Sequence, residues 1–167
     1  VGRGRQAALM APTEVLAEQH QRNLQAWFAP LGIDVVLVSG SQPARTRRSA
    51  LEVVANGTAR IVVGTHALFQ EGLQFHDLSL VIVDEQHRFG VQQRLRLAEK
   101  GVTAAGHPHQ LIMTATPIPR TLAMTAYADL DVSVIDELPP GRTPVKTVVL
   151  AEAKRDEVVA RIAAACR

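Results

Sequence analysis

The 167-residue sequence has little of several residue types, with one cysteine (Cys166), one tryptophan and one tyrosine. A single cysteine excludes an intrachain disulfide framework and is typical of a reducing compartment, so we expect a cytoplasmic protein. No apolar run approaches the roughly 20 residues that span a membrane, and the amino terminus shows no signal-peptide pattern. The formal net charge is only +2. Overall charge therefore gives no electrostatic argument for a polyanionic partner.

The sequence also lacks the Gly-x-x-x-x-Gly-Lys-Ser/Thr loop that holds nucleotide phosphates. The residues at the amino terminus, 1–5, instead predict a turn that leads straight into a strand. We therefore expect the chain to begin inside a domain rather than at its start.

Strand-like apolar runs alternate with helical patterns along the chain, and most of these runs are apolar throughout. Strands of this kind indicate a sheet that is covered on both faces. Their alternation with helices predicts an α/β fold, a parallel sheet with helices on both faces. Strands are expected at 6–11, 33–38, 60–64, 78–83, 109–113 and 132–135, and helices at 12–28, 44–55, 91–99 and 121–128, with a short helical turn at 67–69.

The composition changes at 136–144, which contains three prolines and a glycine. Such a segment forms neither a helix nor a central strand, so it predicts a hinge. A strand at 145–150 and an amphipathic helix at 152–166 are expected beyond it, as at the start of a second α/β domain.

An acidic pair, Asp84-Glu85, directly follows the apolar run 78–83. At the carboxyl end of a parallel strand, such a pair can hold Mg²⁺ and polarise the water that attacks a γ-phosphate. Gln86 and His87 add polar side chains that can sense that phosphate. The alternative is that two acidic residues merely end a strand.

A second polar segment, Thr114-Ala115-Thr116, follows the strand expected at 109–113. Two hydroxyls beside the carboxylate pair can relay a change in hydrogen bonding between a nucleotide and another binding face. The alternative for this segment is a turn that caps the next helix. Both segments together, on separate strand ends, favour the functional interpretation.

Three further strand ends carry small or hydroxyl-bearing residues, which suit contacts with a phosphodiester backbone or plain helix caps. Their recurrence indicates a functional surface along one rim of the sheet. The residues are Pro12, Thr13, Ser39, Gly40, Gly64, Thr65 and His66. The histidines and Cys166 match no zinc-binding pattern in their spacing.

Several of these segments resemble motifs of the superfamily 2 helicases. Asp84 to His87 is similar to the DExH box and Thr114 to Thr116 to motif III, while 11–14 and 64–68 resemble motifs Ia and Ib. Longer stretches are similar to the RecG-type helicases of bacteria, which act on branched DNA. These stretches are 10–20, 84–90, 107–127 and 136–143.

The resemblance implies two RecA-like domains that flank ATP and Mg²⁺. Residues 1–136 would belong to the first domain, 137–144 to the hinge and 145–167 to the start of the second. The implied activity is that of an ATP-dependent 3′–5′ DNA helicase or translocase. It would act on branched DNA, such as replication forks and Holliday junctions, in bacterial DNA repair and recombination at the nucleoid.

The resemblance also implies individual roles. Asp84 would coordinate Mg²⁺, Glu85 would be the catalytic base, and Gln86 would contact the nucleotide. Coupling of hydrolysis to DNA movement would fall to His87 and to Thr114, Ala115 and Thr116. DNA contacts would come from the strand-end residues, with Thr13 and the turn 64–66 at the DNA backbone.

The departure from this family is the missing phosphate loop, with its strand and helix. We therefore expect the isolated chain neither to hydrolyse ATP nor to unwind DNA, and the incomplete sheet to favour self-association through exposed edges. Two other functions remain open at this point. One is the motor of a transcription-repair coupling translocase, and the other is a non-catalytic module that binds DNA or protein.

Overall fold

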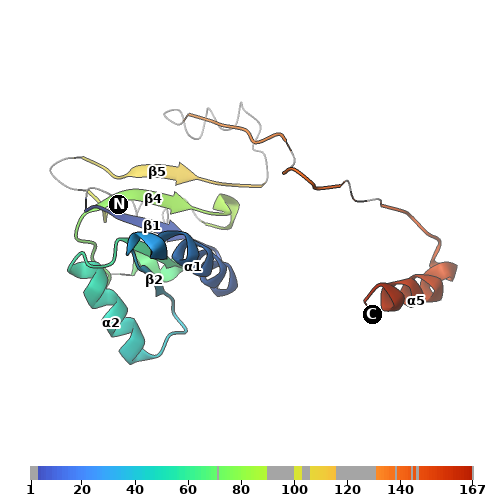
Figure 1. The fold of residues 1–167 in the computed structure, drawn as a ribbon, viewed down its shortest axis with the longest axis horizontal. Helices are drawn as coiled ribbons and strands as arrows, with labels where there is room; N and C mark the ends of the chain where they lie inside the picture. The colour runs from blue at the N-terminus through green and yellow to red at the C-terminus, as the bar shows by residue number, and fades with distance from the viewer. Residues whose placement is uncertain are drawn as a thin grey trace. The chain divides into compact units, whose positions relative to one another are not determined.

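The computed structural model describes residues 4–70, 72–89, 100–102, 106–115, 131–137, 139–143, 145 and 147–166. The chain divides into two units, between Leu122 and Ala123. Described residues of the first unit form a five-stranded sheet in the order β2-β3-β1-β4-β5 (Figure 1). Its elements, with η for a 3₁₀ helix, are β1 (Gln6–Met10), α1 (Glu14–Phe28), η1 (Ala29–Leu31), β2 (Val35–Val38), α2 (Ala44–Ala55), β3 (Ile61–Gly64), η2 (His66–Phe69), β4 (Leu78–Val83), η3 (Gln86–Arg88) and β5 (His109–Ile112).

All four strand pairings in this sheet are parallel, and their registers bring the ends of the strands together. Met10 pairs with both Gly64 and Val83, Val38 pairs with Gly64, and Val83 pairs with Ile112. We call this edge, at Met10, Val38, Gly64, Val83 and Ile112, the carboxyl rim. Every polar segment singled out in the sequence follows one of these five strands.

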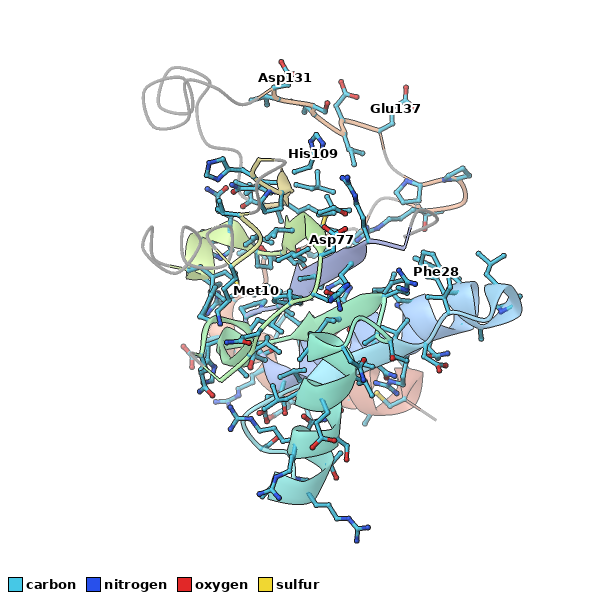
Figure 2. The ribbon with its side chains drawn as sticks, turned by 90° about the vertical axis from the view of Figure 1, so that its left-hand side faces the viewer. Met10, Phe28, Asp77, His109, Asp131 and Glu137 are labelled. Atoms are coloured by element: carbon cyan, nitrogen blue, oxygen red, sulfur yellow. The ribbon has the colours of Figure 1, made fainter. Side chains whose placement is uncertain are left out.

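Helices cover both faces of the sheet because successive side chains of a strand point to opposite sides. In β1, Leu9 packs with residues of α1, whereas Ala8 and Met10 pack with residues of α2. Figure 2 shows Met10 among the packed side chains of this second face. The buried residues are Leu9, Ala11, Ala17, Val35, Ile61 and Val63 on the first face, and on the second Ala8, Met10, Val38, Ala50, Val54, Ala59, Val62, Ala67, Leu68, Leu73, Leu78, Val81 and Val83.

Local signals explain where the helices begin and end. The Thr13 hydroxyl accepts a hydrogen bond from the backbone N–H of Leu16 at 3.3 Å, so Thr13 caps α1. Helix α2 spans the residues predicted from the sequence, and Asn56 is its C-cap. Gly57 follows with a φ of 77°, a conformation that favours glycine.

Most predicted elements of the first unit are confirmed, with small differences at their ends. The strand expected at 33–38 begins at Val35, and the helix expected at 12–28 begins at Glu14. The β5 strand is not covered on both faces as expected, since His109, Gln110 and Leu111 are exposed. The helices expected at 91–99 and 121–128 lie outside the described residues.

Two predicted strands in the second unit are wrong. The described residues of 132–135 and 145–150 have no regular structure, and Ile135 and Val149 are each 95% exposed. A strand forms only against a neighbouring strand, and the described part of this unit supplies none. The helix expected at 152–166 is confirmed as η4 (Glu152–Lys154) and α5 (Arg155–Ala165). None of the helices in the described residues is long and apolar enough to cross a membrane.

Candidate active site

The acidic pair lies at the carboxyl rim, beside its β5 end. Strand β4 lies between β1 and β5 and ends at Val83, so Asp84 is the first residue beyond it. The Asp84 N–H donates to the Met10 carbonyl at 2.9 Å, and the Met113 N–H donates to the Val83 carbonyl at 2.8 Å. Backbone hydrogen bonds to both neighbouring strands therefore fix the point where the two carboxylates leave the sheet.

A sharp turn separates the two carboxylates. Glu85 has a φ of 50° and a ψ of 53°, and it alone among the described non-glycine residues has a positive φ. This left-handed conformation costs roughly 1–2 kcal/mol for a residue with a side chain, and such strain gathers at functional sites. Asp84 Oδ1 accepts a hydrogen bond from the Glu85 N–H at 2.9 Å, which stabilises the turn.

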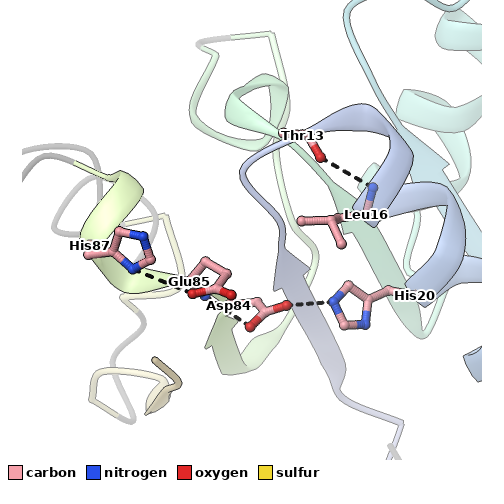
Figure 3. Close-up of polar contacts among 6 residues, drawn as sticks. All are labelled: Thr13, Leu16, His20, Asp84, Glu85 and His87. Carbon is pink, nitrogen blue, oxygen red and sulfur yellow. Dashed lines mark hydrogen bonds and ion pairs between the residues drawn. The ribbon is translucent and has the colours of Figure 1, made fainter. Parts of the chain in front are cut away.

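The Glu85 carboxylate faces His87 of η3 (Figure 3). Its Oε2 lies 3.4 Å from Nδ1 of His87, within ion-pair distance. This oxygen is buried, yet it accepts no hydrogen bond from the part of the chain that the structure describes. Glu85 therefore keeps a lone pair with which to accept a proton.

The segment after β5 is joined to the acidic pair through the backbone. The Gln86 N–H donates to the Met113 carbonyl at 3.0 Å, directly before Thr114, and the Gln86 side chain is buried. Thr114 and Ala115 are exposed, whereas Thr116 lies outside the described residues. The structure thus brings together the two polar segments that the sequence placed on separate strand ends.

The Asp84 side chain also contacts helix α1. Nε2 of His20 lies 2.7 Å from Oδ2 of Asp84, and both side chains are partly buried. Sequence reasoning missed His20 as a member of this site. A signal was present, because His20 lies four residues from Leu16 and from Leu24 on the face of α1 that packs on the sheet. A polar residue in an apolar stripe indicates a polar partner beneath it.

The remaining strand-end residues divide into exposed and buried sets. Ser39, Gly64 and Thr65 are buried, and the hydroxyl oxygen of Thr65 has no hydrogen-bond partner among the described residues. A side chain at Gly64 would place its Cβ 2.3 Å from the Val38 carbonyl oxygen, so glycine allows β2 and β3 to approach here. Partly or fully exposed along the same rim are Pro12, Thr13, Gly40 and His66.

Glu14 ties the first turn of α1 to the loop after β2. Its Oε1 accepts a hydrogen bond from the Ser41 N–H at 3.1 Å. The Ser41 hydroxyl and backbone N–H lower the pKa of the Glu14 carboxyl, and His66 lowers it slightly further. The loop itself is closed by Gln42, whose side chain accepts from the Ser39 N–H and donates to the Leu37 carbonyl.

The donor set suits a magnesium ion that is held jointly with phosphates. No group of three or more His, Cys, Asp or Glu side chains in the described residues can hold a metal ion. Mg²⁺ is commonly bound by one or two carboxylates together with substrate phosphates. Asp84, a half-buried carboxylate at the end of a central strand, fits that arrangement as the protein ligand.

Comparison with known proteins identifies the family of the chain. The family model described as "DEAD/DEAH box helicase" matches residues 2–125. The ATP-dependent DNA helicases RecG of Haemophilus influenzae and of Escherichia coli K12 are each 61% identical over 166 residues, which is 99% of this chain. The chain spans about a quarter of the length of these relatives (24% of each).

A solved structure of RecG bound to a three-way DNA junction superposes with a TM-score of 0.74 at 40% identity. The superposed region includes 95% of this chain and 21% of the chain in that structure. The RecA-like helicase fold expected from the sequence is therefore confirmed, and the resemblance to RecG extends over nearly the whole chain. The chain belongs to the DEAD/DEAH box helicase family.

Proposed function

We propose that this chain is the part of an ATP-dependent DNA helicase that holds the catalytic acidic pair, in a RecG-like protein acting on branched DNA. The observation that carries the proposal is the position of Asp84 and Glu85 at the carboxyl rim, joined by backbone hydrogen bonds to both neighbouring strands. The 61% identity to RecG over 99% of the chain supports the same activity. Family membership supports the use of ATP with Mg²⁺.

Within this proposal, each acidic residue has one role. Asp84 holds Mg²⁺, which when bound neutralises charge on the nucleotide phosphates. Glu85 is the general base, since its partly shielded Oε2 can accept a proton from an attacking water. His87, 3.4 Å from that oxygen, keeps the carboxylate oriented.

Coupling to DNA follows from the bond between Gln86 and Met113. Any shift of η3 when a γ-phosphate is bound or lost is transmitted to Thr114 through this bond. DNA contacts fall to the exposed residues of the carboxyl rim, Thr13, Gly40 and His66. We assign the buried Ser39, Gly64 and Thr65 a supporting role, because they shape the loops that carry those residues.

The experiment is to replace the matching segment of Escherichia coli RecG with this chain and to measure ATPase activity with forked and linear DNA. We expect activity that forked DNA stimulates more strongly than linear DNA. Glu85→Gln should lower kcat by about 10²–10⁴-fold, the usual contribution of a general base. A graft without ATPase activity, or a Glu85→Gln variant with unchanged kcat, would contradict the proposal.

The isolated 167-residue chain serves as the matched control in the same assay. Its sequence contains no Gly-x-x-x-x-Gly-Lys-Ser/Thr loop to hold the β- and γ-phosphates. We therefore expect no ATP turnover from the chain alone. Robust turnover would show that phosphate binding does not depend on such a loop here.

A further inference from the structure

The contact between His20 and Asp84 joins two elements that lie far apart in the sequence. His20 belongs to α1 and Asp84 follows β4, 64 positions later, and their Nε2 and Oδ2 atoms are 2.7 Å apart. The side chains are 27% and 21% exposed, so solvent screens this contact less than it would at an open surface. Figure 3 shows the imidazole and the carboxylate facing each other.

Both carboxylate oxygens of Asp84 are held in this arrangement. Oδ1 accepts from the Glu85 N–H at 2.9 Å, and Oδ2 faces His20. A carboxylate has about four lone-pair sites, so two hydrogen bonds fix its plane and leave lone pairs for a cation. Without His20, the bond from its own turn would be the only one among the described residues to orient the carboxylate.

Packing holds His20 itself in place. Leu16 and Leu24, four residues before and after it, pack against the buried cluster on the first face of the sheet, and Ala17 is fully buried there. The same helix is capped by Thr13, an exposed residue of the carboxyl rim. One rigid helix therefore carries the contact to Asp84 and begins beside a rim residue.

We propose that His20 is a positioning residue, which donates from Nε2 to Oδ2 of Asp84 and fixes this carboxylate for divalent-cation binding. The inference rests on the proposed function, because it gives Asp84 the role of metal ligand. Residues that orient a ligand in this way typically change metal affinity by about 10–100-fold when they are replaced.

The test is a titration of the RecG graft with Mn²⁺ in the presence of ADP, followed through the signal of free Mn²⁺ in electron paramagnetic resonance spectra. We expect His20→Ala to raise the Kd for Mn²⁺ by about 10-fold. His20→Gln should recover much of the loss, because its side-chain amide can donate from a similar position. Gln19→Ala, a change at the exposed neighbour of His20, is the matched control and should behave like the unchanged graft.

Circular dichroism of each graft reports whether the variant is folded. Equal Mn²⁺ affinity of the unchanged graft and a folded His20→Ala variant would overturn the inference and leave the proposed function intact. An Asp84→Ala graft that binds Mn²⁺ as tightly as the unchanged graft would contradict the metal role of Asp84 itself, and with it both proposals.

A second readout comes from the active graft. His20→Ala should raise the Mg²⁺ concentration that gives half-maximal ATPase activity by about 10-fold. The kcat at saturating Mg²⁺ should change much less, since the Glu85 base is untouched. A variant that lowers kcat at every Mg²⁺ concentration, with no change in the half-maximal value, would instead assign His20 a merely structural role.

Discussion

Gly64 ends β3 where its backbone passes close to the Val38 carbonyl and the Leu68 side chain. An added Cβ would lie 2.3 Å from the first and 2.9 Å from the second, and the carbonyl belongs to a paired strand. Overpacking of this kind costs about 1–3 kcal/mol. We expect Gly64→Ala to lower the free energy of unfolding by that amount, measured by denaturant titration.

Gly40 is the matched control for this change, since it also lies just beyond a strand of the carboxyl rim but has no atom within 4 Å of an added Cβ. Gly40→Ala should leave stability within about 0.5 kcal/mol of the unchanged chain. Equal effects at the two positions would contradict the interpretation that Gly64 is required by close packing.

The Glu14 carboxylate makes a pH-dependent contribution to stability. Its pKa is lowered in the folded chain by the hydrogen bonds from Ser41. A carboxyl with a lowered folded pKa stabilises the fold above its unfolded pKa, and this stabilisation is lost as the pH falls through the folded value. Glu14→Gln should therefore be less stable than the unchanged chain at pH 7, and the difference should vanish on acidification.

Denaturant titrations of both chains from pH 7 down to the acid limit would measure this difference. Other carboxylates titrate over the same range, but they are common to both chains and cancel in the comparison. A difference that stays constant with pH would show that Glu14 acts through packing rather than through its charge.

At the scale of elements, the buried Gln6 joins β1 to two other parts of the chain, the end of α2 with the loop after it and the segment before β4. Its Nε2 donates to the carbonyls of Val54 and Ala59 at 2.9 and 2.7 Å, and its Oε1 accepts from the N–H groups of His76 and Asp77. Gln6→Leu would remove the side-chain partner of these four backbone groups, of which the Val54 carbonyl alone keeps a second donor among the described residues, the Gly57 N–H. We expect a loss of about 2–4 kcal/mol in the free energy of unfolding.

Gln74→Leu provides the control, because this glutamine is exposed in the segment that precedes β4. Its replacement should change stability by no more than about 0.5 kcal/mol. Thermal unfolding followed by circular dichroism would compare the two variants. A Gln6→Leu chain as stable as the control would mean that water satisfies the backbone groups in place of the side chain.

The elements predicted well from the sequence are those whose start and end are set by residues close to them in the chain. Strand β4 and helix α2 have the predicted bounds, since an apolar run and an Asn-Gly stop are local signals. The strands expected at 132–135 and 145–150 failed because strand formation depends on a neighbour, which no local pattern supplies. Gln6 was taken as a strand residue, and its four hydrogen bonds depend on groups far along the chain.

At the scale of the whole molecule, the parallel topology explains why the candidate site was largely predictable. Polar residues that follow parallel strands must share one edge, so the acidic pair and Thr114 come together at the carboxyl rim. The contact of His20 with Asp84 could not be derived in this way, because it depends on the rotation of α1 over the sheet. The left-handed turn at Glu85 could not be predicted from the sequence either, since glutamate rarely adopts this conformation.

The last strand of the described sheet gives a prediction about the molecule as a unit. Strand β5 is hydrogen-bonded to β4 alone among the described strands, and Leu111 within it is 50% exposed. An edge strand that exposes an apolar side chain is a template for pairing with another chain. We therefore expect the 167-residue chain to self-associate at micromolar to millimolar concentrations, measured by sedimentation velocity.

Leu111→Lys should abolish this self-association, because a lysine on an edge strand opposes pairing with a second edge. Val15→Lys is the matched control, since Val15 is an exposed apolar residue (72%) on α1, away from β5. It removes an apolar side chain without touching the edge and should leave the association unchanged. A monomeric chain would show that the edge is not a pairing site. Loss of association in both variants would assign it to general surface hydrophobicity instead.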